Sequence, residues 1–118
     1  MNFNKYLLIS AVIFFGVFLL PKISWAADWY ADCAATGTNA GTSWANAWHD
    51  FDHVVWGGSG VVAGDTLYIA GRDATCSYTQ TLAPGVSGSS GSPITIKIGQ
   101  DVGHNGVATI DKNWTNYF

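Results

Sequence analysis

Hydrophobic and polar residues follow three distinct patterns along the chain, and the first is an almost entirely apolar stretch. Residues 6–20 carry no charge and are mostly aliphatic or aromatic. Ser24 and Ala26 then place small residues at the −3 and −1 positions that a signal peptidase recognises. The pattern predicts a secretory signal peptide over residues 1–26, cleaved after Ala26 or Ala27. A membrane anchor is the alternative, although a spanning helix needs about 20 apolar residues and this run is short for that role.

In the second pattern, apolar residues recur every three or four positions, which is typical of a helix. These positions are Trp44, Ala47, Trp48, Phe51, Val54 and Val55. Thr42 or Ser43 can cap the N-terminus of such a helix, and Gly57 can end it. On a helical wheel, one narrow stripe contains Trp44, Trp48, Phe51 and Val55, and the opposite side contains Asn46, His49, Asp50 and His53. We therefore predict an amphipathic helix whose wide aromatic face covers a flat apolar surface.

The third pattern is alternation, which predicts β-strands. The clearest strand is 94–98, where Ile94, Ile96 and Ile98 alternate with polar residues. Further strands are expected at residues 28–35, 66–70, 78–82 and 107–110, between turns rich in glycine and serine. Ile69 and Ile96 lie 27 positions apart, a plausible coil length for a β-solenoid. The two runs could belong to two stacked coils or to two faces of one coil.

Composition restricts the function more than it defines it. The 118 residues suffice for one small domain, and the formal net charge is −3. Removing Lys5 and Lys22 with the predicted leader would take this charge to −5. An acidic chain argues against nucleic acid, which requires a basic surface, and against anionic membranes. No stable membrane insertion is expected after cleavage of the leader.

The two cysteines, Cys33 and Cys76, both follow the predicted leader. An even pair in an exported chain indicates a disulfide, and two reduced buried thiols are the alternative. A CxxC motif is absent from the sequence, so neither a redox motif nor a zinc motif is supported.

Four segments resemble the N-terminal region of the right-handed parallel β-helix proteins, the pectin-lyase-like superfamily: WYADC, GTSWANAW, AGDTLYIAG and GSPITIKIGQDVGHNG. The resemblance spans residues 29–110 and implies an all-β solenoid start. Residues 1–26 would be the leader, and residues 27–118 would form an N-terminal capping helix and the first coil or coils. Many relatives turn with glycine and threonine where this chain has Cys76. A Cys33–Cys76 bond would therefore pin the cap to the first coil.

The same resemblance bears only weakly on activity. The superfamily includes pectate and pectin lyases, other polysaccharide lyases, glycoside hydrolases, phage tailspikes and non-catalytic adhesins. In its enzymes the catalytic and calcium-binding residues usually lie on later coils. No catalytic residue of the family maps onto this chain, so we predict no catalytic, cofactor or metal residues here. Ca²⁺ would be a cofactor only of a full-length lyase.

The segment His49-Asp50-Phe51-Asp52-His53 is similar to the HExxH zinc motif. On a helix its two histidines would share one face, as zinc ligands do. Asp50 is shorter than the glutamate of that motif, and a third ligand is not evident. A solvated polar face is therefore favoured over a metal site.

Two further groups of residues are candidates for binding. Asp65, Asp101 and Asp111 could approach one another on stacked coils and bind Ca²⁺, but turn-forming roles are favoured. Five tryptophans could stack on sugar rings: Trp29, Trp44, Trp48, Trp56 and Trp114. The spacing of Trp44 and Trp48 favours the core, so Trp56 and Trp114 are the better candidates for sugar contacts.

We therefore expect the first part of a secreted, periplasmic or cell-surface β-helix protein, directed at polysaccharide. If the protein is an enzyme, it is a polysaccharide lyase or glycoside hydrolase whose active site lies outside these residues. The alternative function is a non-catalytic adhesin or surface structural protein. A solenoid coil cannot bury its own apolar face, so further coils or self-association through the open end are the expected partners of this region.

Overall fold

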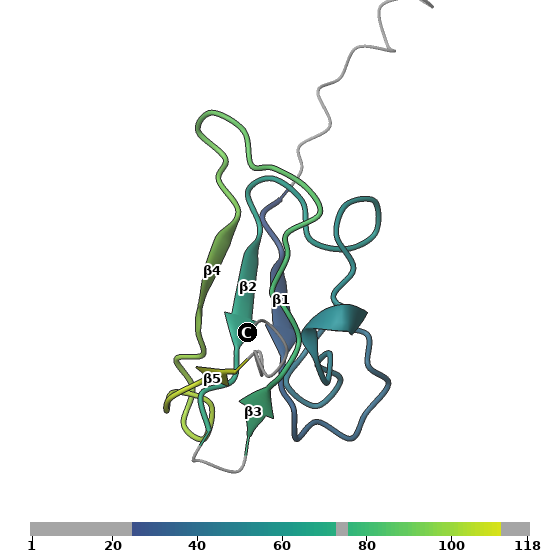
Figure 1. Ribbon diagram of the computed structural model, residues 1–118. Coiled ribbons are helices and arrows are strands. Elements are labelled where there is room, and N and C mark those ends of the chain that lie inside the picture. The colour runs from purple at the N-terminus through teal and green to yellow at the C-terminus, as the bar shows by residue number, and fades with distance from the viewer. Residues whose placement is uncertain (1–24, 73–75, 112–118) are drawn as a thin grey trace, which may run out of the picture.

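The computed structural model describes residues 25–72 and 76–111, and within them the fold is all-β (Figure 1). The predicted signal peptide lies almost entirely outside these residues. The elements are β1 (Asp28–Ala31), the 3₁₀ helix η2 (Phe51–His53), β2 (Thr66–Ile69), β3 (Ser77–Tyr78), β4 (Thr95–Ile98) and β5 (Thr109–Ile110). Every strand is shorter than the alternating pattern predicts. The all-β class is confirmed.

Three strands form a parallel sheet in the order β1-β2-β4, and Figure 1 shows them side by side. In register, Trp29 pairs with Leu67 and Leu67 pairs with Ile96. Ile96 therefore lies beside Leu67, 29 positions earlier, and not beside Ile69 as the predicted 27-residue spacing implied. The two isoleucine-containing runs are neighbours in one sheet, which excludes two faces of one coil.

A second, smaller parallel sheet pairs β3 with β5. The chain passes from β2 to β3 and later from β4 to β5, so the same succession of sheets occurs twice. Between the two sheets an isolated parallel bridge joins Gly71 to Asn105. Parallel pairing of this kind requires a long connection between the paired strands.

The core lies on one face of the three-stranded sheet. Leu67 and Ile69 of β2 are buried, whereas Ile96 and Ile98 of β4 pack against the same cluster but are only partly buried. The difference arises because β2 has a strand on each side, whereas β4 has one only on the β2 side within the described residues. Apolar surface at the β4 end of the sheet is therefore only half covered.

The predicted amphipathic helix is wrong. Within residues 42–57 the structure contains only the three-residue helix η2, and the remainder is turns and extended chain. The N–H of Trp48 donates to the carbonyl oxygen of Tyr30 (2.9 Å), and the Trp48 carbonyl accepts from Asp32 (2.8 Å). These bonds bridge Trp48 to the free edge of β1. The tertiary pairing thus takes the donor that a helix would have directed to residue 44.

The aromatic stripe predicted for this helix is divided accordingly. Trp48 and Phe51 are buried, and Trp48 stacks on Trp29 with ring centroids 5.3 Å apart. Trp44 is only partly buried and Val55 is 46% exposed, so they do not share the buried face. Gly41 permits the close approach of Trp48, because a Cβ at Gly41 would lie 2.5 Å from the indole ring. Residues 42–57 still cover apolar surface, but as a largely extended segment, which we call the tryptophan-rich strap.

The predicted disulfide between Cys33 and Cys76 is confirmed. Cys33 follows β1 and Cys76 precedes β3, with their Cα atoms 5.9 Å apart. The bond ties the N-terminal strand to the start of the second sheet. A disulfide of this kind fits an extracellular or otherwise oxidising location.

Candidate functional site

The outward face of the three-stranded sheet carries a row of aromatic side chains. Tyr30 of β1 is in register with Tyr68 of β2, which is in register with Lys97 of β4. The two tyrosine rings stack with centroids 5.6 Å apart and planes at 16°. The Lys97 ammonium lies 4.9 Å from the centre of the Tyr68 ring, a cation–π distance. Neighbouring side chains in a strand point to opposite faces, so Trp29 and Leu67, each one position before a tyrosine, point towards the core.

Trp44 extends this row beyond the sheet. Its ring meets Tyr30 edge-on at 4.7 Å between centroids and Tyr68 at 6.4 Å. It also stacks on His104 at 4.0 Å with planes at 8°. We call Tyr30, Trp44, Tyr68 and His104 the aromatic patch. All four side chains are partly buried, so each ring keeps some contact with solvent.

Two features fix the position of Trp44. Its indole N–H donates to Asp101 Oδ2 at 2.6 Å. Gly99 makes room for the ring, because a Cβ there would lie 2.8 Å from Trp44 Cη2 and 2.7 Å from the His104 carbonyl oxygen. Gly99 and Asp101 follow β4 directly. The turn after β4 therefore both receives Trp44 and supplies the imidazole on which it stacks.

An ion pair between buried Asp32 and partly exposed Arg72 lies behind the patch. Arg72 donates from Nε to Asp32 Oδ1 (2.8 Å) and from Nη2 to Asp32 Oδ2 (2.6 Å). The carboxylate also accepts the Ala34 N–H, and its side chain is 1% exposed. His104 Nε2 lies 3.2 Å from Arg72 Nη2 and 3.4 Å from Asp32 Oδ2. Asp32, Arg72 and His104 lie in the segments that follow β1, β2 and β4, so this cluster links three segments that are distant in the sequence.

The environment keeps Asp32 ionised. Burial alone would raise the pKa of this carboxyl, but the Arg72 and Ala34 hydrogen bonds and the Arg72 charge outweigh burial and lower the pKa. The same pairing raises the pKa of Arg72. Since both carboxylate oxygens are engaged, Asp32 is poorly suited to act as a general base. The cluster therefore has a structural role: it positions His104 against the Trp44 ring.

The histidine pair of the HDFDH segment does not form a zinc site. Without a helix, His49 and His53 do not share a face. His53 Nδ1 contacts Asp50 Oδ1 at 2.6 Å, and Asp50 also accepts the His53 N–H as the N-cap of η2. His53 is exposed, as predicted, but His49 Nε2 is buried without a hydrogen-bond partner. The prediction that both histidines face solvent is therefore wrong for His49.

Metal-binding geometry is confined to one group of side chains within the described ranges. Asp32, Cys33 and Cys76 place potential ligand atoms within 4.8 Å of one another. The two sulfur atoms are bonded to each other, and Arg72 donates hydrogen bonds to both oxygens of the Asp32 carboxylate. Metal coordination would require thiolates, so these residues do not fit a metal ion in the oxidised protein.

The three aspartates considered for calcium lie apart. Asp65 precedes β2 and is buried, Asp101 follows β4 and holds Trp44, and Asp111 follows β5 and is exposed. Asp65 accepts hydrogen bonds from backbone N–H groups and an indole, which is the turn-forming role that the sequence favoured. The structure does not bring the three carboxylates together.

The structure changes part of the predicted division of the tryptophans between the core and sugar contacts. Trp48 belongs to the core, as predicted, and Trp114 lies outside the described residues. Trp56 packs against the core cluster, and Gly85 lies directly over it. Trp44, predicted to be buried, is the tryptophan of the aromatic patch and is only partly buried. Tyr30 and Tyr68 were not among the predicted binding residues, although each follows an inward-facing apolar residue in its strand.

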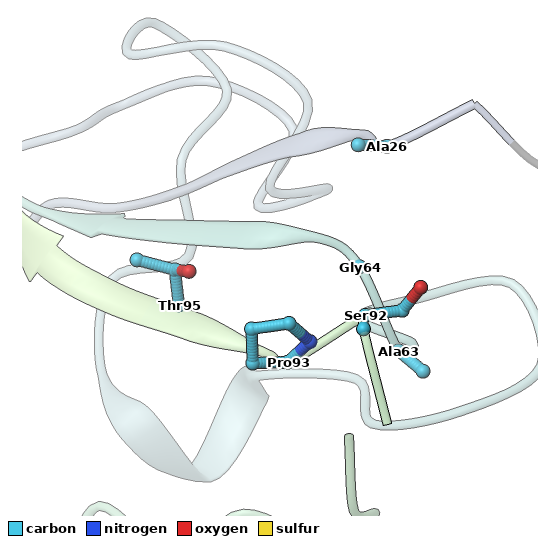
Figure 2. Close-up of a pocket in the computed structure, with 7 residues that line it drawn as sticks. Ala26, Ala63, Gly64, Ser92, Pro93 and Thr95 are labelled. Carbon is cyan, nitrogen blue, oxygen red and sulfur yellow. The ribbon is translucent and has the colours of Figure 1, made fainter. Parts of the chain in front are cut away.

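A separate pocket of about 370 Å³ lies at the N-terminal ends of the strands. Figure 2 shows Ala26, Gly64, Ser92 and Pro93 around it. Its lining consists of small, uncharged residues, and none of them titrates near neutral pH. The lining therefore offers no acid, base or metal ligand.

No protein-family model, no curated protein and no solved structure matches the chain. Among residues 25–72 and 76–111, helices of the length and hydrophobicity needed to cross a membrane are absent.

Proposed function

We propose that this chain forms the start of an exported right-handed parallel β-helix domain that binds polysaccharide through the aromatic patch. The observation that carries the binding role is the contiguous row of Tyr30, Tyr68 and Trp44 on the outward face of the parallel sheet. Catalysis is not assigned to these residues. If the whole protein is a lyase or glycosidase, we place its active site outside residues 1–118.

The β-helix part of the proposal is supported by the repeated path of the chain. β2 and β3 are followed by β4 and β5, each pairing in parallel with its counterpart. The row Trp29, Leu67 and Ile96 forms an apolar ladder along the sheet. The half-covered Ile96 and Ile98 are the residues that a further coil would bury.

The polysaccharide part is supported by the chemistry of the patch. The C–H faces of sugar rings pack on aromatic rings, while their hydroxyls need polar partners nearby. Lys97 and Asp101 lie beside Tyr68 and Trp44 and supply a donor and an acceptor. The rings also cost little entropy to immobilise, since stacking and the Asp101 hydrogen bond already hold them.

One observation favours the alternative of a non-catalytic adhesin or stalk. The buried charges Asp32 and Asp65 both tie strands together and are saturated by hydrogen bonds. Such groups serve the fold, and their hydrogen bonds leave them poorly suited to glycoside chemistry. A stalk would retain this fold without binding sugar.

Binding to a panel of soluble neutral and acidic polysaccharides, measured by affinity electrophoresis, tests the proposal. Tyr30→Ala and Tyr68→Ala should each weaken binding about five- to tenfold, as expected for about 1 kcal/mol per lost ring contact. Tyr68→Phe keeps the ring and should bind nearly as wild type. Val55→Ala, at an exposed position outside the patch, is the control. Equal binding by the Tyr→Ala variants and wild type, or no binding to any polysaccharide, would favour the stalk.

A further inference from the structure

Asp65 is a buried carboxylate without a cationic partner in the part of the chain that the structure describes. It is 2% exposed, and the salt bridges found among the described residues do not include it. Three N–H groups donate to it: the backbone of Ala27 (2.8 Å), the indole of Trp29 (2.9 Å) and the backbone of Val62 (2.9 Å). Burial alone would raise the pKa of Asp65, but these hydrogen bonds lower it, so the group is ionised at neutral pH.

One of these donors lies at the point where the chain enters the fold. Ala27 is the last residue before β1, and its carbonyl oxygen accepts the Thr66 N–H at 2.9 Å. The two preceding residues, Trp25 and Ala26, are exposed, Trp25 by 84%. Within the described residues, which begin at Trp25, the peptide bond between Ala26 and Ala27 is therefore the first whose nitrogen side is held by the fold.

The sequence at this bond is that of a processing site. Ser24 and Ala26 occupy the −3 and −1 positions, where a signal peptidase selects small residues. The sequence alone left cleavage after Ala26 or after Ala27 open. Cleavage after Ala27 would remove both the hydrogen bond to Asp65 and the one from Thr66.

We propose that the chain is cut between Ala26 and Ala27, and that the new α-ammonium group of Ala27 forms an ion pair with buried Asp65. A signal-peptidase-type endopeptidase supplies the catalysis and water is the co-reactant. The water oxygen bonds to the Ala26 carbonyl carbon as the C–N bond breaks, so Ala26 leaves with a carboxylate, and the two protons of the water convert the Ala27 N–H into an ammonium group. The nitrogen is already 2.8 Å from Asp65 Oδ1, so the ion pair forms without movement of the strand.

The surroundings suit a charged terminus. Ala26 borders the pocket formed with Ala63, Gly64, Ser92 and Pro93 (Figure 2). Loss of Ala26 widens this opening, so water can reach the ammonium protons that do not face Asp65. The charged group would thus keep one buried partner and a hydrated side, and the carboxylate would gain the cation that it lacks.

The first test is the N-terminus of the exported protein. The full 118-residue chain is expressed in a bacterial host, and the material recovered from the periplasm or medium is analysed by intact mass and N-terminal sequencing. We expect Ala27 as the first residue. A protein that begins at Asp28, or that retains Trp25, would overturn the proposal.

The second test is the reactivity of the Ala27 amine towards acetic anhydride at pH 7, measured by mass spectrometry. Pairing keeps the amine protonated, so acylation should be about tenfold slower in wild type than in Asp65→Asn. Asp28→Asn removes a neighbouring exposed charge and should react as wild type. If Asp65→Asn does not fold, the wild-type rate is followed against pH. A midpoint near about 8, as for a free α-amine, would contradict the ion pair.

Discussion

Replacing Arg72 with methionine would leave the Asp32 carboxylate buried without its cation. Methionine retains an unbranched apolar stem, so the change removes mainly the charge and the two hydrogen bonds to Asp32. The Ala34 N–H and the more distant His104 would be the remaining partners. We expect Arg72→Met to lower the free energy of unfolding more than other single changes at partly exposed positions of this chain.

The size of this effect follows from the exposure of the two partners. Breaking a fully buried pair costs about 3–5 kcal/mol, whereas exposed pairs contribute about 0–1 kcal/mol. Asp32 is 1% exposed and Arg72 is 33% exposed, so the stranded charge is the buried one. We therefore expect a loss of about 2–4 kcal/mol at pH 7, somewhat below the fully buried value.

The dependence on pH has a definite sign. The folded state lowers the pKa of Asp32, so the ionised form contributes stability above the ordinary aspartate pKa of about 3.9. That contribution is lost as the pH falls through the lowered value. Arg72→Met should therefore cost most near pH 7 and progressively less as the pH falls through the lowered pKa of Asp32, where the wild-type carboxylate also becomes neutral.

Urea unfolding, followed by tryptophan fluorescence at pH 7 and pH 3, measures this directly. Asp32→Asn, Arg72→Met and the double variant complete a cycle with wild type. Because Asp32→Asn replaces the carboxylate with an uncharged amide, the double variant should be less destabilised than the sum of the single changes. Additivity within about 0.5 kcal/mol, or a cost of Arg72→Met below about 1 kcal/mol, would refute the reasoning.

Two further changes test the links between the sheets. Cys33→Ser/Cys76→Ser should lower the free energy of unfolding by about 3–4 kcal/mol, because the bond closes a loop with a sequence separation of 43; reduced wild type should match the double variant. Tyr78→Phe removes a buried hydroxyl that donates to the Ala31 carbonyl oxygen at 3.2 Å and should cost about 1 kcal/mol at pH 7. Burial raises the pKa of Tyr78 to about 12, so its neutral form contributes stability that is complete below about pH 10 and is lost as the pH rises towards the folded value. Tyr78→Phe should show a smaller loss of stability over that interval, and an identical alkaline profile would contradict this.

Local patterning located the strands because their signal is local, although it overestimated their lengths. In 94–98 the alternation of isoleucine with polar residues fixes which side chains face inward, and the structure forms β4 at Thr95–Ile98. The cysteine pair was predictable for a similar reason, since it depends on residue type and parity. Neither inference needed to know which segment lies beside which.

The prediction of a helix was wrong because the same periodicity of apolar residues also fits an extended strap packed on the edge of a sheet. Trp48 and Phe51 point inward in both arrangements, so their burial does not distinguish them. The deciding hydrogen bonds run from Trp48 to Tyr30 and from Asp32 to Trp48, across a large sequence separation. Tertiary pairing overrides a local preference of a few tenths of a kcal/mol per residue.

The aromatic patch could be predicted only in part. The outward orientation of Tyr30 and Tyr68 follows from strand alternation, but their stacking requires the parallel register of β1 and β2. The contact between Trp44 and His104 joins residues 60 positions apart and depends on the space left by Gly99.

The sequence by itself determined the strand-forming segments, their inward and outward faces, the disulfide pair and the acidic charge, because each depends on residue type and short-range spacing. Only the tertiary structure decided the order of the strands, the extended path of the tryptophan-rich strap, the Asp32–Arg72–His104 cluster and the partners of Asp65. These features arise where distant backbone groups and charges must satisfy one another on burial. That requirement has no signature in the spacing of residues along the chain.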